Sequence, residues 1–245
     1  MSHPSVSLHN GNCLEIMKDL EDNSIDLMFC DLPYGQTNCK WDTPIDLDLF
    51  WKQVNRICKI NCPMFFTCTT KFGVNLINSN PKNFRYELIW VKSTVSGHLL
   101  SKKQPLRKTE MIYVFYRKQP FYDLSSHKSK FSITDEKRPE YHTDSELYGK
   151  IARPDYKRKN GESIYEPNLP TNILEIKSEK RKHSTQKPVA LMSWLIKYYT
   201  REGDTVLDPT MGSGSTGVSC KDMKRNFIGI ELNKDIFKIA AERTE

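Results

Sequence analysis

The sequence predicts an α/β protein built on a doubly wound, mainly parallel sheet. Short apolar runs, which are typical of buried strands, alternate with segments of helical spacing over residues 5–92. The same alternation resumes after Pro188, where a glycine-rich loop (MGSGSTG, 211–217) stands between a strand-like run and a helical segment. This order favours parallel strands joined by crossover helices, and we expect one antiparallel strand at the edge of the sheet.

Each expected element follows from its local pattern. Strands are predicted where apolar residues run together between turn signals, at 6–11, 24–30, 63–69, 85–92, 110–118, 203–210 and 226–232. Helices are predicted where apolar residues recur at helical spacing, at 13–20, 46–59, 71–79, 189–200, 215–223 and 234–244. The helix at 189–200 directly follows Pro188, which suits the start of a helix because the first turn needs no N–H donor there.

The middle of the chain lacks this periodicity and carries the excess of positive charge. We predict an irregular insert at 119–182 between two parts of one domain, 1–118 and 183–245. Residues 92–183 contain 20 Lys and Arg against 12 Asp and Glu, an excess of +8, whereas the other residues carry −1. Such a segment is typical of a region that binds a polyanion, although a solvated, lysine-rich surface has the same composition.

Composition excludes several classes of protein. The 245 residues contain no apolar stretch long enough to span a membrane, and the N-terminus lacks the features of a signal peptide, so we expect an intracellular protein. The seven cysteines are scattered, and Cys58 and Cys62 have no second Cys or His pair nearby. We therefore expect reduced, partly buried thiols and no metal site.

The glycine-rich loop indicates a cofactor that carries a nucleoside. Gly212, Gly214 and Gly217 form a G-x-G-x-x-G pattern between a strand and a helix, where glycines permit a sharp turn and close approach of a ligand. Glu231 ends the following strand, where a carboxylate can accept hydrogen bonds from both ribose hydroxyls. The loop lacks the Gly-Lys-Ser/Thr of a phosphate-binding loop, which argues against an NTPase.

An acid before the loop helps to choose among such cofactors. The Asp208 carboxylate would repel a pyrophosphate but would attract the cationic amino-acid end of S-adenosylmethionine. The alternative is that Asp208 and Pro209 only form a turn that ends the strand. Asp31 ends another predicted strand, in CDLPYG at 30–35, and if the two strands are neighbours Asp31 and Tyr34 face the cofactor.

Taken together, these motifs resemble those of the amino-group DNA methyltransferases. The sequence DLPYG at 31–35 is similar to their catalytic motif, and DPTMGSGSTG at 208–217 to their cofactor motif. The catalytic motif comes first and HSTQKP, at 183–188, lies just before the cofactor motif, as in the β group. DLPYG followed by NCKWD looks like a phage and bacterial subgroup of N6-adenine enzymes, and the resemblance covers most of 5–118 and 183–243.

The resemblance implies a Rossmann-like, S-adenosylmethionine-dependent methyltransferase that flips adenine out of duplex DNA and methylates its N6 amine. Asp31 and the carbonyl of Leu32 would accept hydrogen bonds from the amine, and Tyr34, after Pro33, would stack on the base. The expected cofactor contacts are Asn12, Cys13, Asp31, Lys187, Asp208, Thr210, Gly212, Ser213, Gly214, Ser215, Thr216 and Glu231. The expected DNA contacts are Lys102, Lys103, Arg107, Lys108, Arg181 and Lys182, with the insert reading the target sequence.

Two departures from the family pattern keep other hypotheses open. Leu32 replaces a proline, and Asn12 stands where an acid usually reaches the adenine amine of the cofactor. These departures are the support for a catalytically inactive DNA-binding subunit of the same fold, and an N4-cytosine methyltransferase is the alternative enzyme. The alternative for His183 and Lys187 is that they have no functional role and only form part of a polar loop before a helix. Expected partners are double-stranded DNA, a second copy of the chain and a cognate restriction nuclease.

Overall fold

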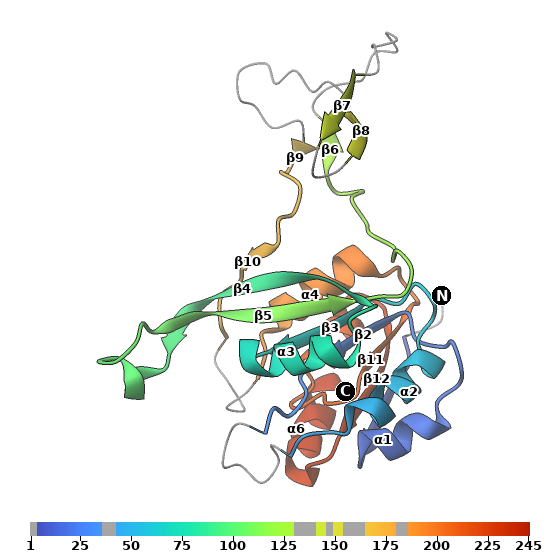
Figure 1. Cartoon of the computed structure of the whole chain (residues 1–245). Coiled ribbons are helices and arrows are strands. Elements are labelled where there is room, and N and C mark those ends of the chain that lie inside the picture. The colour runs from blue at the N-terminus through green and yellow to red at the C-terminus, as the bar shows by residue number, and fades with distance from the viewer. Residues whose placement is uncertain (1–3, 36–42, 130–140, 146–148, 154–164, 180–185) are drawn as a thin grey trace. The chain divides into compact units, whose positions relative to one another are not determined.

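The computed structural model describes residues 4–35, 43–129, 141–145, 149–153, 165–179 and 186–245. The chain divides into two compact units, Met1–Asp123 with Thr171–Glu245, and Leu124–Pro170 (Figure 1). In the second unit β6 (Lys128–Ser129) pairs with β9 (Tyr165–Glu166), and β7 (Tyr141–Ser145) pairs with β8 (Gly149–Arg153), both antiparallel. This unit is shorter at both ends than the predicted insert, since residues up to Asp123 and from Thr171 belong to the first unit.

The first unit is built on an eight-stranded sheet with the order β1-β12-β11-β2-β3-β5-β4-β10. Every neighbouring pair is parallel except the two pairs that β5 makes with β3 and β4. The predicted α/β class with a mainly parallel sheet is therefore confirmed. The strands are β1 (Val6–Asn10), β2 (Leu27–Cys30), β3 (Met64–Cys68), β4 (Phe84–Ser96), β5 (Arg107–Phe115), β10 (Ile173–Glu175), β11 (Thr205–Asp208) and β12 (Asn226–Glu231).

The position of the antiparallel strand differs from the prediction. We expected it at the edge of the sheet, but β5 lies third from the edge because β4 and β10 are added beyond it. The edge strand β10 pairs in parallel with β4, and the sequence predicted no strand there. Three residues are too few to establish a period-2 pattern, which is why sequence reasoning missed β10.

Helices cover both faces of the sheet (Figure 1). One face carries α1 (Cys13–Ile16, continued by a 3-10 turn at Met17–Asp19), α2 (Leu47–Ile57) and α3 (Thr70–Ser79). The other face carries α4 (Val189–Tyr199), α5 (Ser215–Asp222) and α6 (Lys234–Thr244). These positions match the predicted helices, and within the described residues none of them is long and apolar enough to cross a membrane.

Burial on both faces explains why the central strands read as continuous apolar runs. Every residue of β2 and β3 is buried. Phe66 contacts Trp51 of α2, with ring centroids 5.4 Å apart, whereas its neighbour Phe65 contacts Tyr199 of α4 at 4.9 Å. Successive side chains of a strand point to opposite faces, so each strand must supply apolar groups to two helical layers.

The β4–β5 hairpin continues outward beyond the rest of the sheet (Figure 1). Its strands pair from Phe84 and Phe115 at the base to Ser96 and Arg107, with an irregularity after Val91. The tip contains a single 3-10 turn, His98–Leu100, which follows a Gly97 with a φ of 92°. We call residues 93–108 the arm.

Candidate active site

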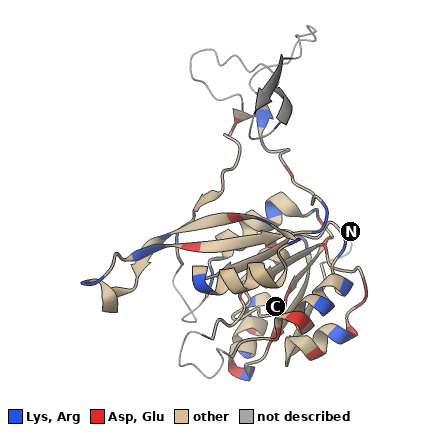
Figure 2. Ribbon diagram, viewed as in Figure 1, with Lys and Arg blue, Asp and Glu red and all other residues tan. Residues whose placement is uncertain are grey.

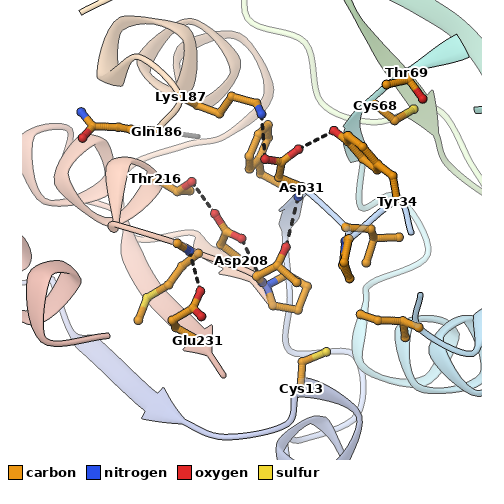
Figure 3. Close-up of a pocket in the computed structure, with 18 of the residues that line it drawn as sticks. Cys13, Asp31, Tyr34, Cys68, Thr69, Gln186, Lys187, Asp208, Thr216 and Glu231 are labelled. Atoms are coloured by element: carbon orange, nitrogen blue, oxygen red, sulfur yellow. Dashed lines mark hydrogen bonds and ion pairs between the residues drawn. The ribbon is translucent and has the colours of Figure 1, made fainter. Parts of the chain in front are cut away.

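Neighbouring parallel strands bring three predicted acids to one edge of the sheet. β2 lies beside β11, so Asp31 follows β2 close to Asp208, which ends β11 (Figure 3). β12 lies on the other side of β11 and ends in Glu231. All three residues line one cavity of about 1160 Å³. Ligands of open α/β sheets bind at this edge, beyond the carboxyl ends of the strands.

Most of the predicted catalytic and cofactor residues line this cavity. They are Asn12, Cys13, Asp31, Leu32, Pro33, Tyr34, Lys187, Asp208, Thr210, Gly212, Ser213, Ser215, Thr216 and Glu231. Gly214 does not line it, but it makes the turn there with a φ of 78° and lies against Ala240 of α6, where a side chain would not fit easily. The role of Gly214 is therefore to shape the loop.

The predicted DNA contacts are distributed differently. Arg107 lines the cavity at the base of the arm. Lys102, Lys103 and Lys108 are exposed; Lys102 and Lys103 lie farther out in the turn of the arm, whereas Lys108 follows Arg107 in β5. Arg181 and Lys182, with His183, lie outside the described residues.

Asp31 is held by three donors on its side chain and one interaction on its backbone. Its Oδ1 accepts hydrogen bonds from Tyr34 Oη at 2.7 Å and Thr67 Oγ1 at 2.5 Å. Its Oδ2 accepts a charge-assisted hydrogen bond from Lys187 Nζ at 2.7 Å (Figure 3). The Asp31 backbone N–H donates to Thr210 Oγ1 at 3.1 Å, which ties β2 to the loop after β11. The carboxylate is thus fixed in one orientation before any ligand binds.

Tyr34 closes over Asp31 from the side of β3 and α3. Its hydroxyl, which donates to Asp31, also lies 2.9 Å from the carbonyl oxygen of Thr67. Its ring packs against Phe72, with centroids 5.2 Å apart at an angle of 38°. Burial and the nearby Asp31 carboxylate raise the pKa of Tyr34 well above its usual value. The phenol therefore stays protonated and acts as a donor.

The departure at Leu32 has a structural explanation. The Leu32 side chain is only 3% exposed and belongs to the apolar core formed with α1, α2 and α3. A leucine here adds burial that a proline ring would not match in shape, while the backbone carbonyl is the same for either residue. Leu32 in place of proline thus changes the packing next to the cavity but keeps the backbone carbonyl that the predicted chemistry needs as a hydrogen-bond acceptor.

Lys187 joins two carboxylates that the sequence leaves far apart. It lies directly before Pro188, the N-cap of α4, and its Nζ contacts Asp31 and also Glu110 Oε1 at 3.1 Å. Glu110 in turn contacts Lys92 Nζ at 3.4 Å. Burial alone would lower the pKa of Lys187, but Asp31 and Glu110 together raise it above its usual value. Lys187 is therefore a permanent cation at neutral pH, balanced by two anions.

The glycine loop owes its shape to residues on three elements. Gly212 has a φ of 53°, and a side chain added there would meet no atom within 4 Å, so its backbone borders open space. Gly217, in α5, packs against the Phe227 ring and Thr244, where a side chain would collide. Arg243 of α6 donates to Ser213 Oγ at 2.9 Å and also to the Ser213 carbonyl. Contacts with β12 and α6 therefore fix the conformation of the loop.

Asp208 is buried below this loop and is 2% exposed. Its carboxylate accepts hydrogen bonds from Thr216 Oγ1 at 2.6 Å and from the Thr210 N–H at 3.2 Å. Burial above all, with a contribution from the Asp31 and Glu231 carboxylates, raises the pKa of Asp208 to about 7, although the two hydrogen bonds oppose this rise. Asp208 therefore both orders the loop and sits near its titration point at neutral pH.

Glu231 and Asn12 also bond to the backbone around the cavity. Glu231 accepts hydrogen bonds from the Gly212 N–H at 3.1 Å and the Asn233 N–H at 2.7 Å. These two hydrogen bonds fix the Glu231 carboxylate at the edge of the cavity. Asn12 is the N-cap of α1, and its Oδ1 accepts from the Leu14 N–H at 2.9 Å. The cap gives Asn12 a structural role, which Asn and Asp fill about equally well.

The lining fits S-adenosylmethionine. Glu231, at the end of β12, provides a carboxylate for the ribose. The Gly212 backbone borders open space and allows close approach of the ligand, and the buried Asp208 provides an acid for its cationic end. These groups lie in the same cavity as Asp31 and Tyr34, so a bound cofactor and the catalytic motif share one space.

Sequence reasoning missed Glu110, Lys92 and Thr67. Glu110 and Lys92 were assigned only to the ends of predicted strands, and Thr67 to the interior of one. The available signal was the polarity of Thr67 and Glu110 within otherwise apolar runs. That signal does not identify partners, because the Lys187–Glu110 contact depends on the order of strands in the sheet.

Comparison with known proteins identifies the family. The model of the N6/N4 DNA methylase family matches residues 25–242. The Type II methyltransferase M.HpaI of Haemophilus parainfluenzae is 26% identical over 96% of this chain and 72% of that protein. The Type II methyltransferase M2.DpnII of Streptococcus pneumoniae is 49% identical, but only over 31% of this chain and 29% of its own length. The DNA adenine methyltransferase YhdJ of Escherichia coli is 25% identical over 96% of this chain and 81% of that relative.

Solved structures agree with this result. M1.HpyAVI in complex with S-adenosylmethionine superposes with a TM-score of 0.64 and 26% identity, over 97% of this chain and 98% of that one. The cytosine-N4-specific PvuII DNA methyltransferase has a TM-score of 0.71 at 14% identity, over 100% of this chain and 88% of that one, which supports the fold alone. With a family match over most of its length and a cavity that fits the cofactor, the chain belongs to the N6/N4 DNA methylases and is an S-adenosylmethionine-dependent DNA methyltransferase.

Proposed function

We propose that this protein transfers a methyl group to the exocyclic N6 amine of adenine in a specific duplex DNA sequence, after flipping the base out of the helix. One observation carries the proposal. The Asp31–Tyr34 segment lies in the cofactor cavity with the Asp31 carboxylate already oriented by Tyr34, Thr67 and Lys187.

The chemistry requires hydrogen-bond acceptors for the amine. An exocyclic amine is a poor nucleophile because its lone pair is delocalised into the ring. Two acceptors, the Asp31 carboxylate and the Leu32 carbonyl, would draw the amine towards tetrahedral geometry and stabilise the positive charge that develops on nitrogen. S-adenosylmethionine supplies an electrophilic methyl group, so the protein mainly positions and polarises.

The hydrogen bonds of Asp31 indicate which oxygen would receive the amine. Oδ1 already accepts from two donors, Tyr34 and Thr67, which fill its two lone pairs. Oδ2 accepts only from Lys187 among the described residues, so one lone pair is left there. We assign Oδ2 as the acceptor for the target amine. Glu110 offsets the charge of Lys187, which reduces the repulsion between that cation and the developing charge on N6.

The flipped base needs an apolar surface to replace part of its lost stacking. Tyr34 is the aromatic ring on the catalytic segment, and its hydroxyl is anchored on Asp31. A ring held at its far end loses little conformational entropy when a base stacks on it. We propose Tyr34 as that platform, with its hydroxyl orienting the carboxylate that binds the same base.

The remaining cofactor and DNA contacts follow from charge and position. Glu231 would bind the ribose, Asp208 the cationic end of S-adenosylmethionine, and Asn12 and Cys13 would border the nucleoside. Lys102, Lys103, Arg107 and Lys108 would contact DNA phosphates, as would Arg181 and Lys182. The insert at 119–182 would read the target sequence. The Type II names of several relatives support a cognate nuclease, and a homodimer is the proposed assembly.

Adenine rather than cytosine is supported by the Asp and Tyr of the motif and by the name of YhdJ, a DNA adenine methyltransferase. An inactive DNA-binding subunit is less well supported, because the two departures that favour it both have packing or capping explanations. The buried Leu32 fills the core, and Asn12 caps a helix.

The test is methyl transfer from labelled S-adenosylmethionine to unmodified duplex DNA, followed by separation of the nucleosides. We expect label in N6-methyl-2′-deoxyadenosine. Label in N4-methylcytosine would refute the choice of base, and no transfer to any duplex would favour the inactive subunit. Sequencing the methylated product also identifies the target sequence.

A further inference from the structure

The arm begins at the mouth of the proposed active site. Ser96 and Arg107, its last paired residues, line the cavity together with Thr109 and Glu110. The ten residues between Ser96 and Arg107 then form the outer turn. A DNA duplex that delivers a base to Asp31 therefore has to lie beside this hairpin. This placement of the duplex rests on the proposed function.

The tip of the arm exposes two leucines to solvent. Leu99 is 102% exposed and Leu100 is 46% exposed. Both lie on the single 3-10 turn that follows Gly97, whose positive φ sets the direction of the turn. Val95 and Leu106 add further exposed apolar surface close by in the arm. Exposed apolar groups gathered on a projecting element mark a surface that binds something.

The charge around these leucines identifies the kind of partner. Residues 88–109 contain no Asp or Glu and five Lys or Arg, four of them in the arm at Lys102, Lys103, Arg107 and Lys108. Figure 2 shows the basic residues along the outer part of the hairpin. A purely basic element suits the phosphate backbone of DNA. Apolar side chains between such cations match the wedges that DNA-binding proteins insert between base pairs.

We infer that Leu99 and Leu100 form an apolar wedge that enters the base stack beside the target adenine when the arm binds DNA. The flanking Lys102 and Lys103 would hold the adjacent phosphates, and the leucines would occupy the space that the adenine leaves. The wedge lowers the cost of extruding the base, while the chemistry stays with Asp31. The partner is duplex DNA, and a second copy of the chain is the competing occupant.

The experiment compares the Leu99→Ala/Leu100→Ala variant with the unsubstituted protein on two duplexes. In one the target adenine is paired, and in the other it is mispaired, which makes extrusion easier. We expect single-turnover methylation of the paired duplex to fall about tenfold or more, because the variant has no large apolar side chain to replace the lost stacking. On the mispaired duplex the variant should approach the unsubstituted rate. The control is Leu49→Ala, which removes a 53% exposed leucine from α2.

A second measurement does not depend on methyl transfer. With 2-aminopurine at the target position, the unsubstituted protein should increase the fluorescence on binding, and the double variant should bind with little increase. An equal loss on both duplexes, or no loss on either, would overturn the wedge. A change of oligomeric state in the double variant would assign the tip to a second copy of the chain. If the unsubstituted protein methylates neither duplex, the proposed function itself fails, a result distinct from failure of the wedge.

Discussion

The floor of the cavity and the arm are built in opposite ways. Around Asp31, Asp208 and Glu231 the polar side chains are paired with one another or with the backbone, and their positions are fixed from several elements. The outer arm instead exposes cations and leucines on a two-stranded extension. The floor is prepared before a ligand arrives, whereas the arm exposes groups that we propose bind DNA.

This difference suggests a division of labour. Preorganised charges are useful where charge develops during a reaction, because they need no rearrangement at that moment. Exposed cations and apolar groups are useful where a large, charged partner is bound. Substitutions on the floor should therefore affect the chemical step, and substitutions on the arm should affect binding and opening of DNA.

The largest expected effect is that of Asp31→Asn. This change keeps the size of the side chain but removes the charge that pairs with Lys187 and that we propose faces the amine. We expect the single-turnover rate to fall about 100-fold or more, similar to the loss of one preorganised group from an oxyanion hole. S-adenosylmethionine binding, measured by calorimetry, should stay within a few-fold of the unsubstituted protein. A normal rate in this variant would contradict the assigned role of Asp31.

The next effect is expected from Lys187→Met. Without Lys187, the Asp31 carboxylate loses the donor that holds Oδ2, and no cation lies between Asp31 and Glu110 to offset their mutual repulsion. We expect a fall in rate of roughly 10- to 100-fold, because the carboxylate is no longer held in one orientation. Glu110→Gln should have a smaller effect because it leaves the Asp31–Lys187 pair intact. A single-turnover rate in Lys187→Met equal to that of the unsubstituted protein would contradict this role of Lys187.

A smaller effect on the rate, but a clear effect on binding, is expected from Lys102→Ala/Lys103→Ala. If both lysines contact phosphates, the slope of log affinity against log salt should become shallower by about 2. Lys52→Ala/Lys238→Ala, which removes two lysines from helices α2 and α6, is the matched control and should leave the slope unchanged. Equal slopes for the arm variant and the unsubstituted protein would exclude the arm from the DNA interface.

The smallest effect concerns pH and Asp208. Its pKa is about 7 in the folded protein, so below this pH the carboxyl is mostly protonated and attracts a cation less well. A bound cation lowers that pKa, and affinity for S-adenosylmethionine should rise as the pH increases from 6 to 7.5. The rise is at most about tenfold for each unit by which the cation lowers the pKa. Calorimetry should find no such rise in Asp208→Asn; an identical rise in that variant would assign the titration to another group.

Much of the fold was predictable because its signals are local. The apolar runs of β2 and β3, the proline before α4 and the glycines before α5 each specify an element without knowledge of the rest. The meeting of Asp31 with Asp208 also followed, since the carboxyl ends of adjacent parallel strands share an edge. The adjacency of β2 and β11 itself was an assumption that the structure confirms.

The features that were missed depend on contacts distant in sequence. β10 forms from three residues that pair with β4, and a segment so short has no signature of its own. Glu110 and Lys187 are 77 positions apart and meet only because of the strand order. The buried position of Leu32 likewise depends on three helices that pack above β2. Tertiary packing, rather than local preference, decides these features.

The most direct test of this division of labour is the single-turnover methylation rate at saturating DNA, measured side by side for Asp31→Asn and for Lys102→Ala/Lys103→Ala. We predict that the arm variant regains the unsubstituted rate once DNA is saturating, because its defect is in binding. Asp31→Asn should stay slow at every DNA concentration. An arm variant that stays slow at saturation, or an Asp31→Asn variant as fast as the unsubstituted protein, would contradict these roles of the arm and of Asp31.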